Sequence, residues 1–97
     1  MAETVDELTV NFTENDVLVT KELDKVVLTK GAWSTILFRY QDWEPAKNAY
    51  SADRYTIRRY QKRNGAYQQK SKFNISSADQ ARALIAALEK WLPEAGE

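Results

Sequence analysis

The 97-residue chain contains no cysteine and no histidine, and only three glycines and two prolines. Without cysteine there is no disulfide framework and no cysteine-based zinc site. Without histidine, the commonest general base and the commonest nucleophile–base pairs of enzymes are also missing. Three glycines do not form a phosphate-binding loop, and the carboxylates are dispersed. We therefore expect a protein that is not an enzyme, with no metal, no cofactor and no small-molecule substrate.

Long apolar runs are also missing, because no stretch approaches the roughly 18 residues that a membrane-spanning helix needs. The first residues, Met1 to Thr4, lack the positive charges that open a secretion signal. These two features predict no membrane segment and a cytoplasmic location. With 43% hydrophobic residues, the chain has a globular composition and is long enough for one domain, 1–97.

Charge is distributed unevenly, although the formal net charge is zero. Residues 1–20 contain five acidic residues and no basic one, whereas residues 54–75 contain seven Lys/Arg and no acidic one. The rest of the chain carries a net charge of −2. A basic stretch in a neutral chain indicates a local site for a polyanion.

The hydrophobic pattern predicts three parts: an acidic extension over 1–16, an antiparallel sheet over 17–75 and a helix over 76–92. We expect residues 1–7 to fray, with a short alternating strand after them. Further strands are expected near residues 17–19, 25–29 and 33–43 and on both sides of a hairpin at Asn64-Gly65. This order of elements predicts an α+β domain, a curved antiparallel sheet of four or slightly more strands followed by one C-terminal amphipathic helix.

The register of the hairpin decides which side chains are exposed. A two-residue loop would set Ile57 opposite Lys72 and mix apolar with charged residues on both faces. A three-residue loop that includes Ala66 pairs Ile57 with Phe73, and a slip of one residue exchanges the faces. We therefore expect the three-residue loop. It turns Tyr55, Ile57, Phe73 and Ile75 toward a core and leaves on the opposite, solvated face Arg58, Tyr60, Lys62, Lys70 and Lys72.

A cationic face that carries an aromatic ring suits single-stranded nucleic acid. Lys and Arg neutralise phosphates, and exposed rings stack on unpaired bases. The candidate nucleic-acid-binding residues on the hairpin are Arg54, Arg58, Tyr60, Lys62, Lys70 and Lys72. The alternative is a solvated edge hairpin whose charges prevent aggregation between strands. Trp33 and Trp43 lie at the two ends of one predicted strand, where each ring either stacks on a ligand or fills the core.

The helix and the acidic extension each have two interpretations. The apolar stripe of the helix reaches beyond a small sheet, which permits a homodimer contact through Leu84, Leu88 and Trp91; the alternative is simple cover of its own sheet. The acidic extension either competes with a polyanion for the basic face or is a solvated tail or strand.

Several segments resemble the transcriptional coactivator positive cofactor four family, especially its small bacterial members. The likeness covers about residues 17–92 and rests on Lys30-Gly31-Ala32-Trp33, Leu37-Phe38-Arg39-Tyr40, Tyr55-Thr56-Ile57-Arg58-Arg59-Tyr60 and Phe73-Asn74-Ile75-Ser76 running into the helix. It implies a four-stranded sheet with a helix, a homodimer, and single-stranded DNA bound on the basic sheet surface. By position it implies ligand contacts at Trp33, Arg39, Arg58, Tyr60 and Lys70.

Three features depart from that family. The loop over 44–53 is longer, Lys72 replaces a glycine, and the acidic segment from Leu8 to Asp16 has no counterpart. The sequence thus predicts a non-enzymatic binder of single-stranded DNA with little sequence preference, with RNA as an open alternative and a role in transcription regulation. The competing hypothesis is a protein–protein interaction module that uses the dimer surface and the tryptophan-bearing rim.

Overall fold

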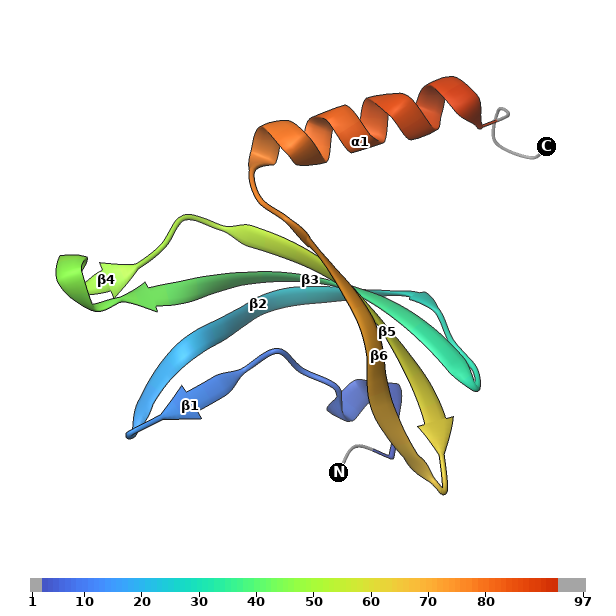
Figure 1. Cartoon of the computed structure of the whole chain (residues 1–97), viewed down its shortest axis with the longest axis horizontal. Coiled ribbons are helices and arrows are strands. Elements are labelled where there is room, and N and C mark those ends of the chain that lie inside the picture. Colours follow the sequence, from blue (N-terminus) through green and yellow to red (C-terminus); the bar gives the residue numbers. More distant parts are fainter. Residues whose placement is uncertain (1–2, 93–97) are drawn as a thin grey trace.

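The computed structural model describes residues 3–92, which form one curled antiparallel sheet with a helix at its C-terminal end (Figure 1). The sheet order is β1-β2-β3-β5-β6, and β4 pairs with β3. The strands are β1 (Phe12–Glu14), β2 (Val17–Thr29), β3 (Trp33–Glu44), β4 (Ala49–Tyr50), β5 (Arg54–Arg63) and β6 (Ala66–Ile75). Two 3₁₀ turns, η1 (Val5–Glu7) and η2 (Pro45–Lys47), and the helix α1 (Ala78–Trp91) complete the fold. The predicted α+β class with one C-terminal helix is confirmed.

The sheet has two faces, which the strand register defines because opposite residues share a face and successive residues alternate. One face carries most of the buried side chains of the strands, and we call it the core face: Ser34, Ile36, Phe38, Thr56 and Tyr60. The other face is turned toward α1, and we call it the helix face: Leu37, Tyr55, Ile57, Phe73 and Ile75. The residues expected in the core thus lie on the helix face, and of these four only Ile75 is buried.

The N-terminal segment covers the core face. Val5, Leu8 and Val10 are each less than 8% exposed and pack with Ile36 and Phe38. The expected fraying is therefore wrong for the described residues up to Glu7, since η1 places Val5 in the core. Met1 and Ala2 lie outside the described residues. The predicted strand around residues 8–12 is replaced by an extended connection that leads into β1.

The hairpin between β5 and β6 combines both registers that the sequence allows. At its base Ile57 pairs with Phe73, as predicted. At its tip Arg63 pairs with Ala66, so the loop has two residues and the predicted three-residue loop is wrong. A β-bulge reconciles the two ends: Arg59 pairs with Ser71 but Tyr60 with Gln69, which leaves Lys70 as the extra residue.

Strand β2 also differs from the prediction. It is one long strand with irregularities between Glu22 and Asp24 and between Val27 and Thr29, where two separate runs were expected. These irregularities bend the strand and let the sheet curl around the N-terminal segment (Figure 1).

Helix α1 begins after Ser77, whose hydroxyl accepts a hydrogen bond from the backbone N–H of Gln80 at 3.1 Å. Its apolar stripe is left uncovered: Ile85 is 56% exposed, Leu88 42% and Trp91 76%. No helix in the span 3–92 is long and apolar enough to cross a membrane.

Candidate nucleic-acid interface

The eight nucleic-acid-binding residues predicted from the sequence do not form one surface. The core face holds Arg54, Arg58, Tyr60, Lys62 and Lys72, as the pairing of β5 with β3 and β6 requires. The helix face holds Trp33 and Arg39. Lys70 lies at the bulge of β6 and is exposed. A ligand on one face therefore reaches only part of the predicted set.

Tyr60 is the main correction. Its side chain was expected in solvent, but it is only 5% exposed and packs in the cluster with Val5, Leu8 and Val10. Burial raises the pKa of the Tyr60 phenol, and the nearby charge of Arg58 opposes that shift. A buried ring has no free face, so Tyr60 does not stack on a base while the N-terminal segment is in place.

Arg39 and Arg54 have carboxylate partners. Arg39 Nη1 lies 3.2 Å from Asp53, which also accepts a hydrogen bond from the Gln41 amide at 2.9 Å. Arg54 Nη1 lies 3.1 Å from Asp42, and its Nη2 lies 3.8 Å from Glu44. These acids come from the end of β3 and the loop before β5, and they lower the local positive potential.

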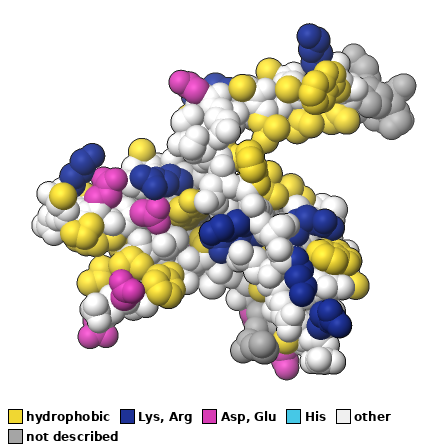
Figure 2. Space-filling model, viewed as in Figure 1, with side chains coloured by type: hydrophobic (Ala, Val, Ile, Leu, Met, Phe, Trp, Pro, Cys, Tyr) yellow, Lys and Arg dark blue, Asp and Glu magenta, His cyan; other side chains and the backbone are white. Residues whose placement is uncertain are grey.

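The remaining cations of the hairpin form the candidate site, which extends over both faces of β5 and β6: Arg58, Lys62 and Lys72 are on the core face, and Arg59 and Arg63 are on the helix face. None of them forms an ion pair with a carboxylate of the described chain, and we call this set the cationic hairpin: Arg58, Arg59, Lys62, Arg63, Lys70 and Lys72. Figure 2 shows Lys and Arg side chains gathered over the β5–β6 arm of the sheet. Arg58 is the least exposed of them, and its Nη1 donates to the Gln69 amide oxygen at 3.1 Å.

Two aromatic rings flank the cationic hairpin, one on each face of the sheet. On the helix face, the guanidinium of Arg59 lies over the ring of Trp33, which is 43% exposed. On the core face, the ammonium of Lys62 lies 5.4 Å from the ring centre of Tyr67. The Tyr67 hydroxyl donates to the carbonyl oxygen of Gly31 at 3.0 Å, which fixes the ring beside the β2–β3 turn.

Sequence reasoning did not place Arg59 or Tyr67 in the site. The two-residue loop would have indicated Tyr67, because that register sets Tyr67 opposite Lys62. The backbone N–H of Lys62 also donates to Ala32 at 2.7 Å, so the hairpin tip is tied to the turn that precedes Trp33.

A second feature lies between α1 and the helix face, where an apolar groove of about 480 Å³ opens. Its lining includes Leu37, Tyr55, Ile57, Ile75, Leu84 and Leu88. The predicted dimer residues Leu84 and Leu88 thus border this groove, and Trp91 projects near the end of the same helix.

The interface combines cations that have no carboxylate partner in the described chain with two partly exposed rings, and this combination can bind an extended anion. No family model, curated protein or solved structure matches this chain.

Proposed function

We propose that this protein is a cytoplasmic, non-enzymatic binder of single-stranded nucleic acid, and that the cationic hairpin is its site. The observation that carries the proposal is the set of six Lys/Arg on β5 and β6 without a carboxylate partner in the described chain. Such charges attract a polyanion, and release of its counterions drives binding. The other two Arg residues of the sheet, Arg39 on β3 and Arg54 at the start of β5, are both ion-paired.

Single strands are favoured over duplexes because the two rings at the site need unpaired bases. Trp33 offers an exposed ring beside Arg59, and Tyr67 offers a partly exposed one beside Lys62. Base stacking on such rings contributes about 1–3 kcal/mol per base and depends little on sequence. The resemblance to the positive cofactor four family supports DNA as the ligand and a role in transcription regulation.

We also propose that the protein is a homodimer joined across the groove between α1 and the helix face. The apolar stripe of α1 and the apolar helix face are both half covered: Phe73 is 52% exposed and Ile85 56%. A second copy presents the same two apolar surfaces, so in a dimer each copy can cover the exposed apolar residues of the other. Sedimentation at micromolar concentration tests this, because a dimer has twice the 11.2 kDa mass of the chain.

The binding proposal is tested by titrating a fluorescently labelled, mixed-sequence single-stranded oligonucleotide with the protein at low and moderate salt. We expect binding that weakens steeply with salt and that unlabelled duplex displaces poorly. Replacing Arg63 and Lys70 together by glutamine should weaken binding at least tenfold, because both side chains are exposed and each contacts phosphate.

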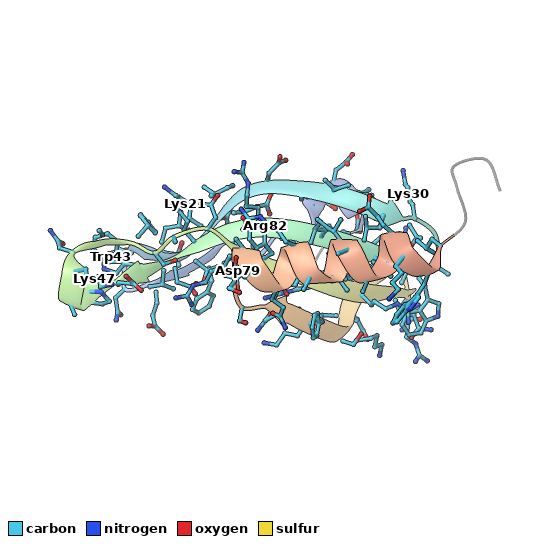
Figure 3. All side chains as sticks on the ribbon, turned by 90° about the horizontal axis from the view of Figure 1, so that it is seen from above. Lys21, Lys30, Trp43, Lys47, Asp79 and Arg82 are labelled. Atoms are coloured by element: carbon cyan, nitrogen blue, oxygen red, sulfur yellow. The ribbon has the colours of Figure 1, made fainter. Side chains whose placement is uncertain are left out.

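The matched control replaces Lys47 and Arg82 by glutamine, which removes the same charge away from the hairpin. Figure 3 shows Lys47 at one end of the sheet and Lys30, beside the β2–β3 turn, at the other. Equal losses in the two variants would assign binding to overall charge and not to the hairpin. No binding of either strand form at low salt would contradict the proposal and favour a protein partner for the apolar groove.

A further inference from the structure

We propose that residues 3–11, which we call the N-terminal cover, are a displaceable competitor that hides an additional base-stacking surface on the core face. This inference rests on the proposed function, because the ligand of the hidden surface is the same single strand. It adds a second, normally closed part of the site and a way to regulate it.

The cover is attached by few groups. Three apolar side chains are buried, Val5, Leu8 and Val10. The main polar anchor is the ammonium of Lys25 on β2, which donates to the carbonyl oxygens of Val5 at 2.8 Å, Asp6 at 3.1 Å and Leu8 at 2.8 Å. One side chain thus satisfies three carbonyl groups of a segment that has little regular structure of its own.

A second anchor is the carboxylate of Glu22, also on β2. It accepts a hydrogen bond from the Thr9 hydroxyl at 2.6 Å and a longer one from the Val10 N–H at 3.4 Å. The Glu22 N–H in turn donates to the Asn11 side chain at 2.7 Å. Apart from the three buried side chains, the cover is thus held to the sheet by hydrogen bonds to two residues of β2, Lys25 and Glu22.

The surface beneath the cover has the composition of a stacking site. Phe38 and Tyr60 are buried there, and Tyr40 and Tyr67 pack at the margin. Arg58 lies on the same face, and its buried Nε has no hydrogen-bond partner among the described residues. Opening the cover would therefore expose four aromatic rings on the core face, two of which, Tyr60 and Tyr67, lie on the strands of the cationic hairpin, together with an unused donor for a phosphate.

The negative charge of the cover is arranged like that of a nucleic-acid strand. Its acidic side chains, Glu3, Asp6 and Glu7, are exposed, while its apolar side chains point to the sheet. A strand of nucleic acid has the same arrangement, with charge outside and apolar bases toward the rings. The cover and the ligand thus compete for one face, and the apparent affinity is lowered by the fraction of molecules that are closed.

The substitution Lys25→Met separates this proposal from simple electrostatics. It removes the anchor of the cover and keeps most of the aliphatic stem. If charge alone decides binding, loss of a lysine weakens it. If the cover competes, the Lys25→Met variant binds a single-stranded oligonucleotide about tenfold more tightly. The matched control is Lys21→Met, because Lys21 is on the same strand but on the helix face and does not contact the cover.

Amide hydrogen exchange gives a second readout that needs no variant. In the wild-type chain, saturating single-stranded oligonucleotide should speed exchange of residues 5–11, because the ligand displaces them. Unchanged or slower exchange there, with salt-dependent binding intact, would overturn the cover and leave the hairpin site standing. Weaker binding of Lys25→Met than of Lys21→Met would overturn it too. If Lys25→Met binds the oligonucleotide and the wild type does not, the cover is supported and the cationic hairpin is not sufficient for binding. If neither protein binds, both the cover and the proposed function are overturned.

Discussion

The guanidinium carbon of Arg59 lies 4.7 Å from the ring centre of Trp33, on the helix face of neighbouring strands. A cation at this distance is attracted by the ring's quadrupole, and it holds one face of the indole while the rest stays accessible. The pair therefore places a cation and a partly exposed ring at one point of the sheet, where the proposed site would use them for a phosphate and a base.

The first prediction concerns Trp33. Replacing it by alanine should weaken binding of a single-stranded oligonucleotide about tenfold, because one stacked base contributes about 1–3 kcal/mol. The measurement is a fluorescence-anisotropy titration. A variant that keeps Trp33 as its only tryptophan, with Trp43 and Trp91 changed to phenylalanine, should lose indole fluorescence when oligonucleotide is added. An unchanged emission in that variant would show that Trp33 does not stack.

The second prediction concerns the salt dependence of binding. Each phosphate contact to a single strand contributes about 0.7 to the slope of log K against log salt. Changing Lys62 and Lys72 to glutamine should thus lower the slope by about 1.4. The control pair, Lys47 and Lys90, is exposed and outside the hairpin, and the same changes there should leave the slope unaltered. Equal slopes in both pairs would argue against a hairpin site.

The strands, the hairpin and the helix were predictable because their local signals agree with the fold. The apolar pattern gave the register at the base of the hairpin, and the Asn64-Gly65 pair indicated the two-residue turn. The registers that these two signals imply differ by one residue, and the bulge at Lys70 accommodates both. The predicted register followed the apolar pattern alone, because a β-bulge has no clear signature in a single sequence.

The burial of Tyr60 was not predictable from the local sequence pattern. Charged residues lie beside Tyr60 on the same face of the hairpin, so the sequence suggests that this face is solvated. In the structure it is the core face. The decisive contacts come from Val5, Leu8 and Val10, which are about fifty residues away in the chain and lie in a segment too acidic to suggest a core. Long-range packing of this kind overrides the local pattern.

The third prediction follows from the burial of Tyr60 and Tyr40, which raises the pKa of both phenols above 10.0. In the unfolded chain these groups lose their protons near pH 10, whereas in the folded chain they keep them to higher pH. Their contribution to stability is therefore complete below pH 10 and is lost as the pH rises through the folded pKa.

Thermal unfolding at a series of pH values between 8 and about 11 tests this. The melting temperature of the wild-type chain should fall above pH 10 more steeply than that of the Tyr60→Phe variant, and the double variant with Tyr40→Phe should be flatter still. Identical pH profiles for the three proteins would mean that Tyr60 is solvated and that the N-terminal cover does not close on it.

The fourth prediction tests the dimer through α1. Ile85 is 56% exposed in the single chain, so an aspartate there costs little in a monomer. In an apolar dimer contact the same carboxylate is buried without a partner, at a cost of several kcal/mol. Ile85→Asp should therefore sediment at the 11.2 kDa mass of one chain, while the wild type sediments at twice that mass.

Ala86→Asp is the matched control for the dimer. It adds the same charge to the same helix, but on the side opposite Leu84 and Leu88, because residues at i and i+4 share a face and the next positions do not. This variant should remain dimeric. If α1 only covers its own sheet, neither variant will change the mass, and Ile85→Asp will change the melting temperature only slightly, because Ile85 is 56% exposed in the single chain. The sedimentation masses of the two variants thus separate a contact between copies from a contact within one chain.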